Sequence, residues 1–144
     1  MSLPPIAFID FETYYDQDFS LSKLQTDEYI LSPQFETTLV SVKVDGTHHV
    51  FCDTDEAVIC GLLHSVVDDW SKYAICCHNT MFDGFILAMR YGIKPRMWLD
   101  TLPMCKMIFP HLRSHSLANL AKFFNFPDKG GAVHNMKGKH LLDM

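Results

Sequence analysis

Apolar and polar positions along the first half of the chain follow the periods of β-strands. Residues 6–11 are apolar on both alternating faces until the acids begin, which predicts a central strand covered on each side. Residues 39–44 alternate, Asp45-Gly46 is typical of a two-residue hairpin turn, and residues 48–52 form the return strand. These strands are expected to form a three-stranded antiparallel meander. Residues 13–36, between the first two, predict an irregular or partly helical excursion.

The next stretch changes to helical spacing. Residues 53–56 supply capping oxygens and first-turn acids, and the apolar positions behind them repeat every three or four residues, at Ile59, Leu62, Leu63, Val66 and Trp70. A helix over this stretch would pack on the sheet. Residues 74–77 form a short apolar run bounded by polar residues, which predicts a buried strand.

The last third continues the alternation. Residues 80–91 predict a helix with an apolar stripe at Phe82, Phe85, Ile86 and Met89. Residues 98–100 predict a short strand and residues 116–124 a helix with a serine cap, followed by a loop beyond Pro127. The order βββαβαβα predicts an α/β fold, with a mixed sheet of meander and parallel strands flanked by helices.

Length and composition fit this fold. With 144 residues, 48% of them hydrophobic and 20% charged, residues 1–144 are expected to form a single domain. No run of eighteen apolar residues and no signal-peptide pattern is present, so an intracellular protein without a membrane anchor is expected. The net charge of −5 argues against holding nucleic acid by bulk electrostatics. Residues 1–96 contain 14 acidic and 6 basic side chains, however, whereas residues 97–144 contain 3 and 6.

Two acids at the end of the first strand are the first candidates for chemistry. Asp10 and Glu12 are two residues apart on a strand, so their side chains share a face. Neighbouring carboxylates repel each other unless a cation lies between them, and Mg²⁺ or Mn²⁺ prefers such oxygen ligands. A surface pair in a chain with 17 acids is the alternative interpretation.

A second group of polar residues lies where the fourth strand meets its helix. The segment reads His78-Asn79-Thr80-Met81-Phe82-Asp83. Asn79 and Asp83 are four residues apart and are expected to share a helix face, with Asp83 in or near the first turn. The alternative is a helix cap and a first-turn acid without a further role.

The two segments together resemble a known family. Asp10-Phe11-Glu12-Thr13, followed by His78-Asn79-x-x-Phe82-Asp83, is similar to the first two motifs of the DEDD, or DnaQ-like, 3′–5′ exonucleases. The similarity extends to the Asp100-Thr101 step and to the segment Arg113–Leu117. Within the family, the chain most resembles the N-terminal proofreading domain of phage family A DNA polymerases.

The resemblance implies a ribonuclease H-like fold and hydrolysis of single-stranded DNA from its 3′ end, yielding nucleoside 5′-monophosphates. It also implies two divalent ions, Mg²⁺ or Mn²⁺, in a complete site. The acids that match metal ligands and catalytic residues are Asp10, Glu12 and Asp83. The positions that match substrate contacts are Thr13, His78, Asn79 and Phe82.

One part of the family pattern is missing. A fourth acid, in a Tyr-x-x-x-Asp or His-x-x-x-x-Asp motif, is expected on a final helix, and the late residues His134, His140, Asp128 and Asp143 lack the required spacing. Loss of that helix is expected to expose an apolar patch on one sheet face. Three hypotheses follow: an exonuclease domain, half of a split exonuclease or polymerase completed by a second chain, and a 3′-end-binding module that does not cut. The residues do not distinguish a DNA from an RNA substrate.

Overall fold

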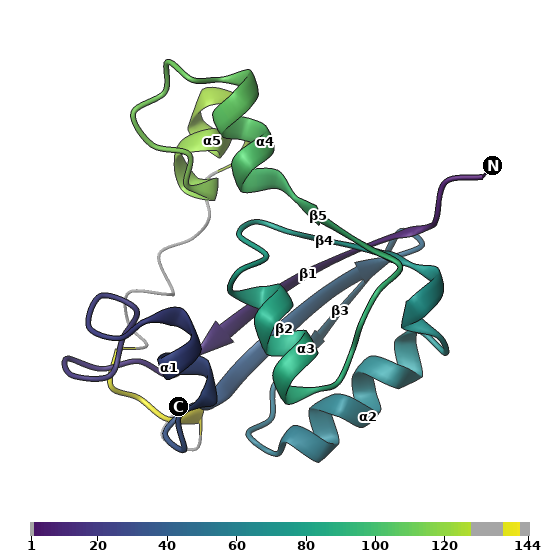
Figure 1. The fold of residues 1–144 in the computed structure, drawn as a ribbon, viewed down its shortest axis with the longest axis vertical. Coiled ribbons are helices and arrows are strands. Elements are labelled where there is room, and N and C mark those ends of the chain that lie inside the picture. Colours follow the sequence, from purple (N-terminus) through teal and green to yellow (C-terminus); the bar gives the residue numbers. More distant parts are fainter. Residues whose placement is uncertain (1, 128–136, 142–144) are drawn as a thin grey trace.

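The computed structural model describes residues 2–127 and 137–141, and in that part of the chain a five-stranded mixed sheet forms the centre of the fold (Figure 1). The strand order is β3-β2-β1-β4-β5. β1 pairs antiparallel with β2 and β2 with β3, whereas β4 is parallel to β1 and to β5. The strands are β1 (Ile6–Thr13), β2 (Thr37–Val44), β3 (Thr47–Phe51), β4 (Ala74–Cys77) and β5 (Met97–Asp100). The predicted meander and parallel strands are therefore confirmed.

Local sequence explains the hairpin and the first long helix. Asp45 and Gly46 both have positive φ, 50° and 77°, as a two-residue turn between twisted strands requires. Asp55 caps α2 (Glu56–Val66) by accepting a hydrogen bond of 2.8 Å from the Ala57 amide. The turn and the cap are those that the sequence predicts.

One face of the sheet carries the hydrophobic core. Alternate residues of β1, namely Ala7, Ile9 and Phe11, are buried on this face. Helices α2 and α3 (Asp83–Arg90) lie across it (Figure 1). Their inward side chains, Ile59, Leu63, Ile86 and Leu87, are fully buried. Burial of these side chains from water is the main stabilising contribution to the fold.

The opposite face of the sheet is open, which corrects the expectation that the central strand is covered on each side. Phe8 on β1 and Val50 on β3 are each 50% exposed, and Ile6 is exposed beside them. Apolar periodicity shows that a strand has two apolar faces but not that an element covers both. Within the described residues, these side chains form an exposed apolar patch on this face.

Several helices differ from their predicted extents. α2 ends at Val66, and Trp70 lies in a separate 3₁₀ turn (Trp70–Lys72) that Asp69 caps. α1 (Thr26–Leu31) is the helical part of the predicted excursion, and α5 (Leu117–Phe123) follows the Ser116 cap as expected.

α4 (Thr101–Ile108) was not predicted. None of its side chains is fully buried, and Leu102 and Cys105 are partly buried. Most of the loop predicted beyond Pro127 lies outside the described residues. Within the described part of the chain, every helix is too short or too polar to traverse a bilayer.

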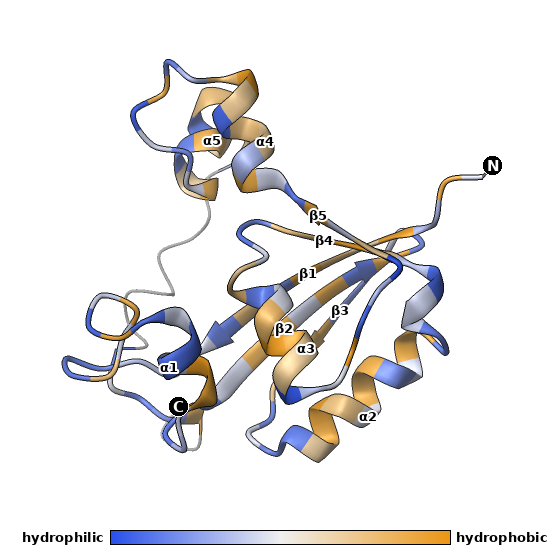
Figure 2. Cartoon of the chain, in the orientation of Figure 1, coloured by the Kyte–Doolittle hydropathy of each residue, from blue (hydrophilic) through white to orange (hydrophobic). Residues whose placement is uncertain are grey.

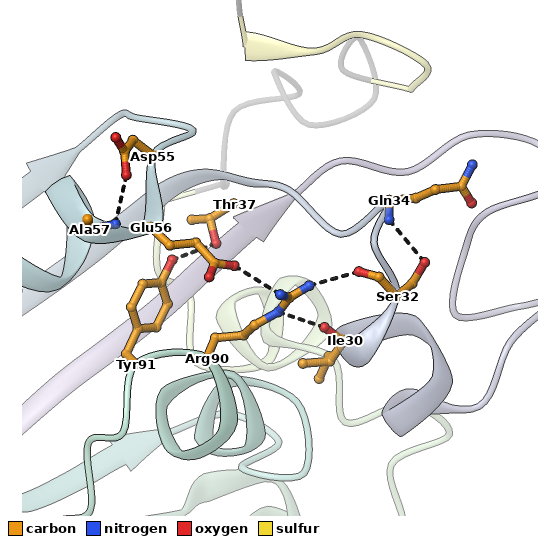
Figure 3. Close-up of polar contacts among 9 residues, drawn as sticks. All are labelled: Ile30, Ser32, Gln34, Thr37, Asp55, Glu56, Ala57, Arg90 and Tyr91. Carbon is orange, nitrogen blue, oxygen red and sulfur yellow. Dashed lines mark hydrogen bonds and ion pairs between the residues drawn. The ribbon is translucent and has the colours of Figure 1, made fainter.

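Arg90, at the end of α3, connects three elements (Figure 3). Its Nε donates a hydrogen bond of 2.9 Å to the Ile30 carbonyl oxygen, and one terminal nitrogen donates another of 2.8 Å to that of Ser32. The other terminal nitrogen lies 3.3 Å from Glu56 Oε1, at the start of α2. The guanidinium also lies over the Phe35 ring, 4.8 Å from its centre. This side chain therefore holds the end of α1 against α2 and α3.

We expect Arg90→Ala to lower the free energy of unfolding by about 2 kcal/mol, because two carbonyl groups and a carboxylate lose a charged donor. Urea unfolding followed by circular dichroism measures this change. The matched control is Lys94→Ala, an exposed cation just beyond the same helix. Equal losses in the two variants would contradict a role specific to Arg90.

Candidate functional site

Asp10 and Glu12 occupy alternate positions near the end of β1, on the face opposite the buried Ile9 and Phe11. Asp10 is paired with Ser41 of β2, and the regular register of β1 with β2 breaks between Glu12 and Thr13. The two carboxylates therefore lie at the end of the central strand, on the open face of the sheet.

A hollow of about 680 Å³ lies on this open face beside Asp10. Its volume is in the range of small-molecule sites, which is about 300 to 1,000 Å³. Phe8, Cys76 and Leu117 form its apolar wall, His78 also lines it, and Lys43 and His48 add nitrogen donors. A ligand in this hollow would thus meet an acid, a cation and an apolar floor together.

Asp83 is brought to the same place from α3. It is the first residue of that helix and is buried, with 3% of its surface exposed. Its Oδ1 accepts a hydrogen bond of 2.9 Å from the backbone N–H of Phe11, the residue between Asp10 and Glu12. Asp83 therefore lies against the backbone of the segment that carries Asp10 and Glu12.

The environment of Asp83 opposes its ionisation. Burial is the largest cause, and the negative charges of Asp10 and then Glu12 add to it, while the Phe11 N–H acts in the opposite direction. Together these effects raise the pKa of Asp83 to about 7. The carboxyl group is electrostatically coupled to the other two acids, as expected of groups that share a site.

The donor set suits a hard divalent cation. Among residues 2–127 and 137–141, no three acidic, histidine or cysteine side chains lie close enough together to hold a metal ion by themselves. Mg²⁺ does not need three such side chains, because it keeps several waters and is held by one or two carboxylates together with substrate phosphates. Asp10 and Glu12, with Asp83 behind them, fit this mode of binding.

Two predicted substrate contacts are anchored next to the acids. Thr13 Oγ1 lies 2.8 Å from the hydroxyl of Tyr29, which also donates to the Tyr14 carbonyl oxygen. Phe82 is the N-cap residue of α3, is partly buried, and lies 6.2 Å from the Tyr29 ring, centre to centre. Tyr29 joins this group from α1, sixteen residues along the chain from Thr13, and no local spacing in the sequence predicts this contact.

Asn79 does not share a helix face with Asp83, which corrects the sequence prediction. The helix begins only at Asp83, and Asn79 has a φ of 88° in the turn before it. A spacing of four residues indicates a shared face only when all the intervening residues are helical. Asn79 is therefore presented by a turn.

Asp100, at the end of β5, holds this turn in place. Its Oδ1 accepts hydrogen bonds of 3.0 Å from the Asn79 amide and from the Leu102 amide. Its Oδ2 accepts from the Thr80 amide at 2.9 Å and from the Thr80 hydroxyl at 2.8 Å. Desolvation acts to raise the pKa of Asp100, but these donors outweigh it and lower the pKa below its ordinary value. Both oxygens of Asp100 therefore accept from backbone and hydroxyl donors.

We expect Asp100→Asn to lower the free energy of unfolding at pH 7 by about 2 kcal/mol, because an amide NH₂ would face donors that need an acceptor. The pKa of Asp100 is lowered in the folded chain, so its contribution is present above the ordinary pKa and is lost as the pH falls through the folded value. Urea unfolding at pH 7 and pH 3 measures both effects. A difference between variant and wild type that stays constant with pH would contradict this account.

His78 connects β4 to the following helices. Its Nε2 donates to the His115 carbonyl oxygen at 2.7 Å, because a carbonyl oxygen can only accept. Its Nδ1 lies 2.8 Å from Thr101 Oγ1, whose hydroxyl also lies 3.3 Å from the Cys77 carbonyl oxygen. Both ring nitrogens are engaged, so His78 contributes a ring surface to the hollow and not a metal-binding nitrogen.

Among the late residues considered for the fourth-acid motif, the structure describes His140, which does not lie at the site. His140 Nδ1 lies 2.9 Å from Glu36 Oε2, and its ring stacks on Tyr14 at 4.1 Å between centres. His134, Asp128 and Asp143 lie outside the described residues. Within the described range, the carboxylates coupled to Asp83 are Asp10 and Glu12.

Comparison with known proteins finds similar structures. No protein-family model matches the chain, and no curated protein sequence does so either. A nuclease solved in its apo form aligns with a TM-score of 0.59 and 17% identity, over 89% of this chain and 55% of that one. Brucella melitensis NrnC with bound Mg²⁺ aligns with a TM-score of 0.57 and 17% identity, over 90% and 57%. The EXO domain of Aedes aegypti Nibbler aligns with a TM-score of 0.56 and 10% identity, over 91% and 63%.

These similarities concern the fold. The chain spans between 55% and 63% of the length of these three structures. The specific resemblance to polymerase proofreading domains stays a prediction. The mixed sheet and its helices are the expected ones, and the chain has the ribonuclease H-like fold that these nucleases share.

Proposed function

We propose that the chain is a metal-dependent 3′–5′ exonuclease domain that removes nucleoside 5′-monophosphates from single-stranded DNA ends. The observation that carries the proposal is that Asp83 accepts a hydrogen bond from the backbone N–H between Asp10 and Glu12 and is electrostatically coupled to both. Asp10 also lines an open hollow, in a fold that solved nucleases share. NrnC, one of these nucleases, was solved with bound Mg²⁺.

Asp10, Glu12 and Asp83 are the residues that would hold the divalent ions. When bound, Mg²⁺ or Mn²⁺ lowers the pKa of water and neutralises charge on the phosphate and on the departing 3′ oxygen. The three carboxylates supply the oxygen ligands for this chemistry. Asp83 is protonated below about pH 7 in the metal-free chain, so ion binding there releases a proton.

The remaining side chains would position the strand. Thr13, fixed by Tyr29, is placed to meet the terminal sugar, while Asn79 and Phe82 border the path of the last nucleotides and His78 gives its ring surface. Lys43 and His48 line the hollow and bring nitrogen donors to a phosphate group. The acidic chain thus has local donors where the substrate would lie.

The test is the shortening of a 5′-labelled single strand in the presence of Mg²⁺ or Mn²⁺. A ladder of products shorter by single nucleotides is expected, whereas a circular single strand stays intact. A DNA and an RNA strand of the same sequence identify the sugar preference. Activity on the circular strand, or no shortening of the linear one, would refute the proposal. Proofreading alongside a polymerase is the setting that the sequence resemblance implies.

The open apolar sheet face favours a second candidate, in which the chain needs a partner that supplies the fourth acid and a covering helix. Phe8 and Val50 are half exposed on this face, next to the acids. In a third candidate, the chain grips 3′ ends without cutting them. Calorimetric metal stoichiometry and nuclease activity on one preparation separate the three. Turnover supports the exonuclease, one ion without turnover supports the incomplete half, and strand binding without metal-dependent turnover supports the binding module.

A further inference from the structure

The helices α4 and α5 form an exposed unit at the end of β5, apart from α1, α2 and α3 (Figure 1). A row of aromatic rings runs through this unit, and we call it the aromatic strip. Successive ring centres are 5.1 to 6.0 Å apart, from Phe126 to Phe124, on to Phe123, and then to His111, with Phe109 packed behind Phe123 and Phe124.

The strip is far more exposed than core aromatic residues are. Phe123 is 43% exposed, Phe124 44% and Phe126 65%, and Met107 and Ile108 are exposed nearby on α4. Figure 2 shows α4 and α5 largely in the colours of hydrophobic residues. A contiguous apolar surface of this kind marks an interaction site on a soluble domain.

The charge around the strip indicates what it binds. Residues 101–127 contain the exposed cations Lys106, Arg113 and Lys122 and no Asp or Glu, although the chain as a whole has a net charge of −5. Exposed rings among cations suit an unpaired strand, because bases stack on aromatic faces while lysine and arginine contact phosphates. A purely apolar helix of a partner would use the rings but leave the concentration of positive charge without a counterpart.

The strip also adjoins the hollow beside Asp10. A second hollow, of about 400 Å³, is lined by Phe124, Phe126 and Leu120. It shares His78, Thr101 and Leu117 with the first hollow. A strand that enters the first hollow therefore has a continuous path to the rings.

We propose that the aromatic strip, with Lys106, Arg113 and Lys122, is a separate binding surface for single-stranded nucleic acid. Bases stack on Phe123, Phe124 and Phe126, and the cations contact the phosphates. This inference rests on the rings and charges of α4 and α5 and does not require that the chain cleave its ligand. The aromatic strip contacts nucleotides that lie away from the 3′ end of the bound strand.

The test is fluorescence anisotropy of a labelled dodecathymidylate strand, measured in EDTA so that nothing is cut. Phe126→Ala is expected to weaken binding at least about fivefold, because one base loses its stacking surface. Arg113→Gln combined with Lys122→Gln is expected to lower the slope of log affinity against log salt by about 1.4, since two phosphate contacts are lost. Phe126 is the most exposed ring of the strip, so its removal leaves the core intact.

Matched controls separate the strip from general effects. Leu31→Ala removes an equally exposed apolar side chain from α1, and Lys23→Gln with Lys94→Gln removes two exposed cations elsewhere. These variants are expected to bind as the wild type does. The measurement is made in EDTA, so binding is expected to persist even if the proposed cleavage is wrong.

Three results would overturn the inference. The first is unchanged affinity and salt slope in the strip variants, and the second is no binding of the strand by the wild type. The third is a dimer in light scattering that Phe126→Ala dissociates while strand binding is unaffected, which would assign the strip to a second copy of the chain.

Discussion

At pH 8 in EDTA, the Asp83→Asn variant is expected to gain stability relative to the wild type, by about 3 kcal/mol more than it does at pH 5. Burial, together with Asp10 and Glu12, raises the pKa of Asp83 to about 7 from an ordinary value of 3.8. The asparagine has no charge to desolvate, and its carbonyl oxygen still accepts from the Phe11 N–H.

The sign follows from the two states of the carboxyl group. Below about pH 4 it is protonated in the folded and unfolded chain, so the stability associated with its raised pKa is fully present. As the pH rises from about 4 to 7, the unfolded chain releases the proton that the folded chain retains, and this stability is lost. Above about pH 7 the folded carboxyl group ionises too, and the difference becomes constant.

Urea unfolding at pH 5, 6, 7 and 8 measures the difference between variant and wild type. Asp68→Asn, which alters an exposed acid after α2, is the matched control and should show a difference that does not change with pH. A parallel pH dependence of wild type and Asp83→Asn would contradict the account. Adding Mg²⁺ at pH 8 should stabilise the wild type more than the variant, because an ion offsets the buried charge.

Strand periodicity and turn chemistry were sufficient to predict the sheet. The alternation in residues 39–44 and the Asp45-Gly46 turn are local signals, and the hairpin forms as they indicate. α4 was not predicted, and in the structure none of its side chains is fully buried. Trp70 follows Val66 at helical spacing, yet the helix ends first, because spacing alone does not reveal where a chain leaves a helix.

The candidate site likewise combines residues that the sequence identifies with contacts that it does not. Asp10 and Glu12 stand out in the sequence because they interrupt an apolar strand, and Asp83 because it lies at the start of a helix. The support behind them is long-range, since Asp100 holds the Asn79 turn across 21 residues and Tyr29 reaches Thr13 across 16. Such contacts depend on the tertiary arrangement and leave no local pattern. The acids were therefore predictable and their positioning was not.

The two surfaces on the open side of the chain differ in what they demand of a ligand. The hollow beside Asp10 combines acid, cation and apolar wall, which suits the end of a strand with its metal ions. The aromatic strip has cations and rings without acids, which suits a strand without metal. Substitutions in the hollow should therefore impair metal-dependent cutting, and substitutions in the aromatic strip should impair metal-free binding.

Asp10→Asn is expected to lower the rate of shortening of a 5′-labelled strand by about 10³-fold or more, because a metal-held carboxylate contributes several kcal/mol to the stabilisation of charge. The asparagine keeps the size of the side chain on β1 opposite Ser41, so the sheet register should not change. Initial rates in Mg²⁺ and in Mn²⁺ measure the effect, and calorimetry on the same preparations measures ion binding.

Asp18→Asn is the control for this loss. Asp18 is an exposed acid in the loop after β1, and its removal changes the net charge by the same amount as removal of Asp10. It should leave both the rate and ion binding close to those of the wild type. Full shortening by Asp10→Asn would show that the cut is made elsewhere or by a contaminant. A variant that binds ions normally but does not cut would place Asp10 in contact with the substrate and assign the ion to Glu12 and Asp83, because these are the carboxylates that remain beside it.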